Sequence, residues 1–428
     1  MPRPVPENCD EALPDCQNCF KSGRTCVRSR EPPIKYIIHT INPELQKCLF
    51  NAQQNATDGR SISEQDLNKV RLSVSRSPAV ALEDLPIVTL FRHYIDVLAP
   101  WYDLNDAQNM FGTIVPVRAI LPGNAILFKA LIAFSACHMN RTAQDLAQLG
   151  SVYHASCVEE LLAALNDVSL DHHEDYLAAT CLLRSYEILN GDMRRHQNHL
   201  LGAYSFATNR PIDLTIRGLA QTGTWNYLRE EITVALESRR SVRFSTGFHF
   251  VPELVMADQW ANAITFILAK TINLCFSDAS NESMDERNNL WQALAAELAS
   301  WRHGLPITFQ PFSTASRPGN VFPSIWLLRP WHGKFIHFKS LNRADLCLIV
   351  AAEQYCSVIE ILLELSRPCS TETSLRPPAI DRSRETIVQH VLKICGLAYT
   401  NDNIPARVNA FGPLAFCGRY LREATHRN

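Results

Sequence analysis

The sequence of 428 residues lacks the long apolar runs of membrane and exported proteins. The stretch expected to come nearest to a membrane span, 119–139, is interrupted by Pro122, Gly123, Asn124 and Lys129. It therefore fails the requirement of about 18 uninterrupted apolar residues for a membrane span, and no membrane partner is expected. The N-terminal segment has no apolar core of the signal-peptide kind, so we expect an intracellular chain with reduced thiols.

An excess of charge of either sign is also missing. The chain has 41 Lys and Arg against 43 Asp and Glu, a net charge of −2. No basic field surrounds the whole protein, so any contact with nucleic acid must come from a local patch. Hydrophobic residues make up 46% of the chain, which is enough to bury a large core.

Motifs of common enzyme classes are absent as well. The sequence contains no G-x-G-x-x-G after a strand, no P-loop, no H-E-x-x-H and no G-x-S-x-G. It also lacks the D-D-x-x-D motif that a helical, terpene-cyclase-like enzyme would need to bind magnesium. We therefore predict that the protein is not an enzyme.

What the sequence does contain is a cysteine cluster near its start. Of the 14 cysteines, four lie within residues 9–26, and the other ten are spread singly. The spacing C-x6-C-x2-C-x6-C predicts a Zn²⁺ site, because a C-x2-C pair places two thiolates close enough to share one tetrahedral ion. The predicted ligands are Cys9, Cys16, Cys19 and Cys26. Free thiols or a redox pair are the alternatives, but no strand pattern surrounds the C-x2-C pair.

The chain divides into three regions by composition. Residues 1–30 form the cysteine block, and 31–82 are rich in Pro and Ser without periodicity, which is typical of a linker. Residues 83–428 have helical periodicity and few strand signals, so we predict an all-α body. The stretch 304–333, rich in Pro, Gly and aromatic residues, is predicted to be a loop folded over this body.

Apolar stripes with helical spacing mark the helices of the body. They are Val88, Phe91, Ile95 and Leu98; Leu127, Ala130, Leu131, Phe134 and Cys137; Tyr153, Cys157, Leu161 and Leu165; Trp225, Leu228, Ile232 and Ala235; and Trp291, Leu294, Leu298 and Trp301. Further helices fit at about 256–276, 341–365, 382–399 and 405–422. The side chains expected to be largely buried are Phe91, Trp225, Trp291 and Trp301.

Several polar clusters of the body invite a functional interpretation. The sequence Asp-His-His-Glu-Asp at 171–175 has metal-ligand chemistry, but it fits a capped helix start better. The charged residues 229–231 fit a polar helix face with local ion pairs. The arginines within 239–243 fit a helix C-terminus better than a phosphate site, and the His196 and His199 pair lacks a third ligand.

The cysteine block resembles a known family. The segment CDEALPDCQNCFKSGRTC is similar to the second half of the fungal zinc binuclear cluster, in which six cysteines bind two zinc ions. Its four cysteines match the third to sixth of the family. The first C-x2-C and the basic helix of the family are missing, and Pro2, Pro4 and Pro6 exclude a helix before Cys9. We therefore expect one zinc, and expect that an upstream exon would be needed for the complete cluster.

The missing basic helix weakens the expected binding to DNA. Residues 1–35 carry six basic and five acidic side chains, a net charge of +1. The candidate phosphate contacts are Lys21, Arg24, Arg28 and Arg30. Four such contacts would give weak, salt-sensitive affinity of about 10⁻⁴ M or weaker. We expect that the chain as written selects no specific DNA site.

Most of the remaining sequence resembles the fungal-specific transcription factor domain. The similar segments are 90–116, 124–139, 153–165, 174–192, 199–206, 218–240 and 408–421. This resemblance implies a helical regulatory domain, a nuclear transcription regulator, and as partners DNA, the transcription machinery and a small effector. The alternative is an interaction protein that keeps the helical domain and binds protein partners or an effector without contacting DNA.

Overall fold

A computed structural model describes most of the chain from Val74 onward. The described residues are 74–141, 146–165, 173–191, 214–244, 254, 256–277, 283–315, 322–327, 343–368, 378–401 and 404–421. The predicted zinc ligands, the predicted phosphate contacts and nearly all of the predicted linker lie outside them, as do His196 and His199.

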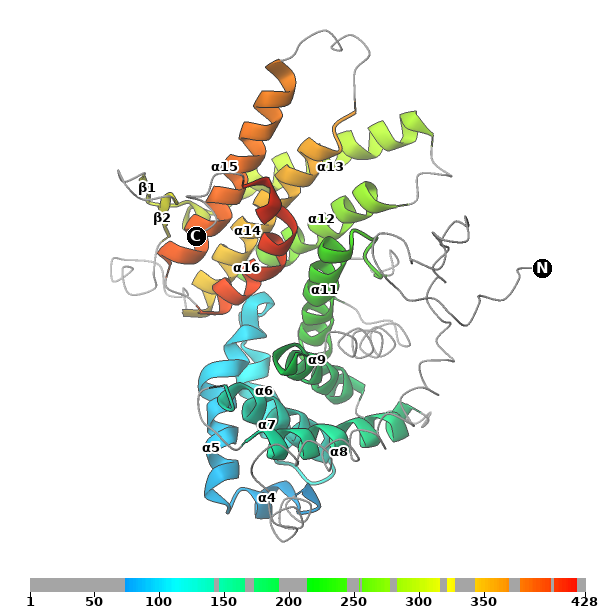
Figure 1. Ribbon diagram of the computed structural model, residues 1–428, viewed down its shortest axis with the longest axis vertical. Coiled ribbons are helices and arrows are strands. Elements are labelled where there is room, and N and C mark those ends of the chain that lie inside the picture. Colours follow the sequence, from blue (N-terminus) through cyan, green and yellow to red (C-terminus); the bar gives the residue numbers. More distant parts are fainter. Residues whose placement is uncertain are drawn as a thin grey trace, which may run out of the picture. The chain divides into compact units, whose positions relative to one another are not determined.

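The described residues are mainly α-helical, which confirms the all-α prediction (Figure 1). The first helices are α4 (Pro78–Ala81), α5 (Leu85–His93), α6 (Met110–Ala119), α7 (Ala125–Met139), α8 (Ala147–Leu165) and α9 (His173–Asn190). They are followed by α11 (Leu219–Ser238), α12 (Ala257–Phe276), α13 (Met284–Gly304), α14 (Arg343–Leu365), α15 (Pro378–Thr400) and α16 (Ile404–Cys417). Short 3₁₀ or π segments are η2 (Tyr94–Leu98), η3 (Ala99–Trp101), η4 (Asp103–Asn105), η6 (Ile307–Phe309) and η8 (Gly418–Tyr420).

Helix α5 buries a different face from the one the sequence indicated. Val88 and Ile95 of the predicted stripe are 39% and 37% exposed, and Phe91 is only half-buried. Leu98 is buried as predicted, but the other buried members, Ile87, Leu90 and Tyr94, each lie one residue before a predicted position. Both sets have helical spacing, so the sequence pattern alone does not distinguish them. The choice depends on packing against α7.

The predicted aromatic loop contains a small sheet. Strands β1 (Ser313–Ala315) and β2 (Ser324–Trp326) pair antiparallel, with Ser313 opposite Trp326. The backbone N–H of Ile325 donates to Thr400 Oγ1 at 3.2 Å, and Asn401 Nδ2 donates to the Ile325 carbonyl at 3.0 Å. The loop prediction is therefore wrong here, because three-residue strands are too short to leave an alternating pattern in the sequence.

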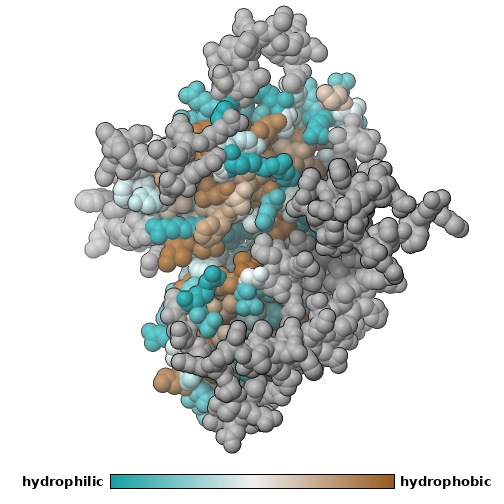
Figure 2. All heavy atoms as spheres, viewed as in Figure 1, coloured by the Kyte–Doolittle hydropathy of each residue, from teal (hydrophilic) through white to brown (hydrophobic). Residues whose placement is uncertain are grey.

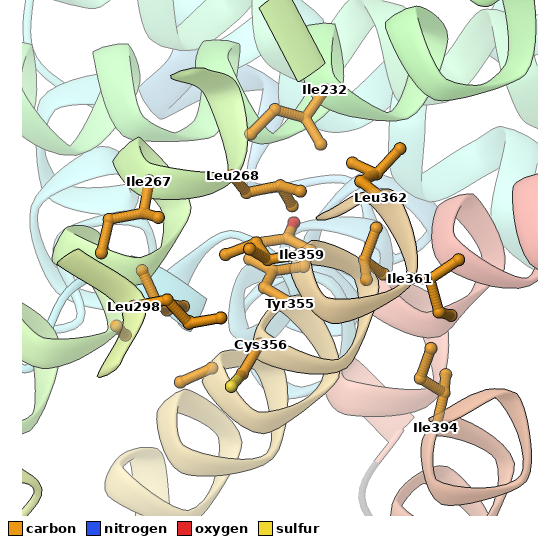
Figure 3. Packing of buried hydrophobic residues seen from close by; sticks show 14 of the residues in the cluster. Ile232, Ile267, Leu268, Leu298, Tyr355, Cys356, Ile359, Ile361, Leu362 and Ile394 are labelled. Carbon is orange, nitrogen blue, oxygen red and sulfur yellow. The ribbon is translucent and has the colours of Figure 1, made fainter. Parts of the chain in front are cut away.

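The core of the C-terminal helices is centred on α14, which contacts α12, α13, α15 and α16. Figure 3 shows Tyr355, Ile359 and Leu362 of α14 among side chains of the surrounding helices. The window Leu346–Leu365 is long and apolar enough to cross a membrane, yet 83% of it is buried inside the protein. Each fully buried aliphatic side chain contributes about 1.5–3 kcal/mol, so α14 is the core helix of this region.

Two of the four predicted aromatic core residues are fully buried. Trp225 and Trp301 are 0% and 4% exposed, as predicted. Trp291, like Phe91, is only partly buried. Its indole Nε1 donates to the Leu363 carbonyl at 3.0 Å, which holds the ring at the edge of the core.

Candidate functional site: a buried polar junction and a groove

Helix α11 carries three charged residues in succession inside the protein. Arg229 is 9% exposed and Glu231 is 0% exposed, while the Glu230 side chain is 13% exposed. The prediction of a polar face with local pairs is therefore wrong. Successive residues of an α-helix point about 100° apart, so each of these side chains meets a different neighbour. We call this cluster and its partners the polar junction.

Glu230 pairs with Arg184 of α9. An Arg184 Nη1 lies 3.2 Å from Glu230 Oε2, and Nη2 donates to the Glu230 carbonyl at 3.4 Å. Burial raises the pKa of the Glu230 carboxyl, and the charges of Arg184 and Arg229 oppose that shift. The neighbouring Tyr102 also has its pKa raised, by burial first and then by Glu230. Its hydroxyl stays protonated and donates to Ser185 Oγ at 2.5 Å.

Arg229 connects α11 to α16 and α14. Its Nη2 donates to Asn409 Oδ1 at 2.8 Å. The same oxygen accepts from the Tyr355 hydroxyl at 2.9 Å, and Asn409 Nδ2 donates to Gln354 Oε1 at 2.9 Å. These bonds satisfy polar groups that would otherwise cost about 1–3 kcal/mol each when buried.

Glu231 fixes the C-terminal end of its own helix. It accepts two hydrogen bonds from the Arg240 guanidinium and one from the Arg243 backbone N–H at 2.7 Å. Arg239, at φ 51°, ends α11 in the left-handed conformation. This geometry agrees with the helix C-terminus interpretation of the arginines at 239–243.

The described part of the 171–175 cluster holds an arginine. An Arg118 Nη1 lies 3.1 Å from Glu174 Oε1 and 3.0 Å from Asp175 Oδ1, and Asn124 Nδ2 donates to the second Asp175 oxygen at 2.8 Å. Asp171 lies outside the described residues, so its predicted capping role stays a prediction. The described ranges contain no group of three or more His, Cys, Asp or Glu side chains that would hold a metal ion.

The buried thiols of the body are poor nucleophiles. Burial raises the pKa of Cys137 to about 11 and that of Cys417 to about 12. Cys356 also has a pKa of about 11, although Arg302 Nε donates to its Sγ at 3.2 Å. At neutral pH these thiols are protonated, and a protonated thiol is neither a nucleophile nor a good metal ligand.

A groove lies between α13 and the C-terminal end of α14, and we call it the α13–α14 groove. Its volume is about 180 Å³. The α13 side presents an apolar wall made of Trp291, Ala295, Leu298 and Ala299, followed by Arg302. The opposite side presents Glu360, Leu363, Glu364 and Arg367.

Sequence reasoning missed both features because their residues are far apart in the chain. Arg184 lies 46 residues from Glu230, and Asn409 lies 180 residues from Arg229. One sequence feature does indicate the junction. Arg184 directly follows the mainly apolar run Ala178 to Leu183, and a charge buried with such a run would be costly without a partner. The groove has no comparable signal.

Comparison with known proteins gives one family. Residues 89–231 match the family model of the fungal specific transcription factor domain. This range runs from α5 into α11 and ends at Glu231, so it contains Arg184 and the three charged residues of the junction. No curated protein and no solved structure matches the chain. The chain therefore carries, within its helical body, a region similar to the regulatory domain of fungal transcription factors.

Proposed function

We propose that this protein is a fungal transcription regulator of the zinc-cluster type that acts in the nucleus. The match of residues 89–231 to the fungal specific transcription factor domain carries the proposal. In this role the helical body is the regulatory part, which contacts the transcription machinery. The four N-terminal cysteines bind one zinc, and the basic residues from Lys21 to Arg30 contact DNA phosphates.

A tethering assay tests the regulatory role. The full chain is fused to an unrelated DNA-binding domain, and a reporter gene with the matching site is measured in fungal cells. We expect reporter output to change by several-fold relative to the DNA-binding domain alone. A second fusion, with Arg184→Met, tests whether the polar junction contributes to the effect. A reporter that responds to neither fusion, with both proteins present in the nucleus at equal levels, would contradict the proposal.

A second candidate is an interaction protein that does not contact DNA directly. Exposed apolar side chains on α15 and α16 favour it: Tyr399, Ile404 and Phe411 are 76%, 56% and 70% exposed. Figure 2 shows hydrophobic side chains gathered over the region where these two helices lie in Figure 1. Aromatic residues of this kind are enriched in protein interfaces.

Selection from a random DNA pool at about 150 mM salt distinguishes the two candidates, because phosphate contacts alone are weak at that ionic strength. The full chain is compared with a variant whose four N-terminal cysteines are changed to serine. Retention of DNA by the first protein alone, without selection of one sequence, supports direct phosphate contact by the zinc-bound block. Equal binding by both, or none by either, supports the interaction role.

A further inference from the structure

Two histidine rings join the C-terminal ends of α5 and α7. His93 Nε2 lies 3.0 Å from His138 Nδ1, and the two ring centroids are 5.1 Å apart. At this distance between the nitrogens, one donates its hydrogen and the other accepts it. The contact is therefore a hydrogen bond between two helices. A ring nitrogen accepts only while it carries no proton, so this bond depends on pH.

Aromatic packing surrounds the hydrogen bond. Phe91 of α5 packs against Phe128 of α7, with ring centroids 6.0 Å apart. Trp101 of η3 lies edge to face with His138, and their centroids are 5.4 Å apart. Both histidines are only partly buried. The pair is therefore a polar contact within an apolar junction, and its rings still reach solvent and can exchange protons.

The groups around the two rings keep both of them neutral at pH 7. Burial lowers the pKa of His93 and the neighbouring His138 lowers it further, while Asp96 raises it. Asp96 is itself paired with Arg92, whose Nε lies 3.2 Å from Asp96 Oδ2. Burial also lowers the pKa of His138, and Arg141 adds to that shift. These charges come from α5, η2 and the turn after α7. Among the described residues, no charged group of α6, α8 or α9 shifts the pKa of either ring.

Protons weaken this contact in two steps. The first leaves an imidazolium that still donates to its neutral neighbour. The second leaves no accepting nitrogen and places two positive rings side by side, which repel each other. We propose that the His93–His138 pair is a latch that holds α5 on α7 at neutral pH and releases it when both rings are protonated. This histidine latch lies within residues 89–231, so it makes the packing of the family-matched region sensitive to acidity.

Hydrogen–deuterium exchange of the full chain tests the histidine latch. Peptides from α5 are compared at about pH 7.5 and about pH 5, with rates corrected for the intrinsic pH dependence of amide exchange. Peptides from the core helix α14 report global opening. We expect the protection of α5, relative to α14, to fall by about fivefold or more at the lower pH, the factor that loss of one net hydrogen bond gives. Unchanged relative protection would overturn the proposal.

Variants of the two rings separate the hydrogen bond from local packing. In the double variant His93→Gln with His138→Asn, two amides take the places of the ring nitrogens and hydrogen-bond without titrating. This variant should protect α5 equally at both pH values. His138→Ala removes one partner, so α5 should exchange faster at both. The matched control is His303→Gln, at the exposed end of α13, which should keep the pH dependence of the unchanged protein.

Thermal unfolding at neutral pH shows that each variant is folded. A pH dependence that persists in the double variant and in His138→Ala would assign it to other groups and refute the histidine latch. Because exchange is measured on the chain alone, this outcome is independent of the transcription assay.

Discussion

Replacement of Arg184 by methionine would test the electrostatic account of the polar junction. Methionine keeps an unbranched side chain of similar length but removes the guanidinium that faces Glu230. The Glu230 side chain is only 13% exposed, and the ordinary pKa of a glutamate carboxyl is 4.5. A buried carboxylate that loses its partner takes up a proton rather than remain charged. The variant should therefore fold with a neutral Glu230.

The free energy of that proton uptake sets the size of the effect. Each pH unit above the ordinary pKa costs about 1.36 kcal/mol, so protonation of Glu230 at pH 7 costs about 3.4 kcal/mol. Arg229 also lowers the pKa of Glu230 and offsets part of this cost. We expect the variant to lose about 2–3 kcal/mol of unfolding free energy at pH 7.

The pH dependence of the loss identifies its cause. Burial raises the pKa of Glu230 in the unchanged protein as well, and loss of the Arg184 charge raises it further, so the folded variant keeps a proton that the unfolded chain releases over a wider range of pH. The stability of the variant then falls as the pH rises above about 4.5. At pH 5.5 the proton costs only about 1.4 kcal/mol, so about half of the destabilisation should disappear.

Urea unfolding of the full chain at pH 5.5 and pH 7 measures these differences. The double variant Arg184→Met with Glu230→Gln is the control, because it removes both charges and should recover to within about 1 kcal/mol of the unchanged protein. An equal loss at both pH values would refute the reasoning. A double variant no more stable than the single one would refute it too, because packing and not charge would then be the cause.

Three further predictions concern other parts of the chain. Gly396→Ala should lower the unfolding free energy by about 1–3 kcal/mol, because a Cβ there would lie 2.3 Å from the Pro323 carbonyl oxygen; Gly418→Ala, which meets nothing within 4 Å, should leave the melting temperature unchanged. Burial and neighbouring cations lower the pKa of His390 to about 4. The unfolding free energy should therefore fall by about 2 kcal/mol as the pH drops from 6.5 to 4. His390→Gln should remove this part of the pH dependence. Elemental analysis of the purified chain should give about one zinc, which a chelator removes without melting the helical body; two tightly bound ions, or none, would contradict the ligand prediction.

The helical spacing of apolar residues predicted the buried side chains correctly where a helix has a single apolar face. Trp225, Leu228, Ile232 and Ala235 are all fully buried, as their spacing predicts. The α5 stripe failed because that helix is apolar on two sides, and only contact with α7 decides which side is covered. Periodicity records amphipathicity, but it does not record which neighbour packs on a helix.

Whether a charged residue is buried or exposed was harder to predict, because it depends on partners that lie far away in the sequence. A charged triplet such as 229–231 has the same composition on a solvated face and inside a protein. The fold buries this triplet by placing Arg184, Arg240 and Asn409 beside its side chains. The α13–α14 groove depends on Ala295 lying opposite Glu360, a relation between two helices that no local pattern encodes. The zinc site of the cysteine block rests on ligand spacing alone and stays a prediction, because its residues lie outside the described part of the chain.

The apolar character of α14 has a consequence for synthesis of the chain. Two of the helices that cover it, α15 and α16, follow it, and α16 ends at Cys417, 52 residues after Leu365. At about 5–20 residues per second, a ribosome needs about 3–10 s to complete them. During that interval α14 is a hydrophobic helix with uncovered sides, of the kind that chaperones and membranes capture. Folding of this protein therefore depends on how quickly residues 366–417 emerge and pack on α14.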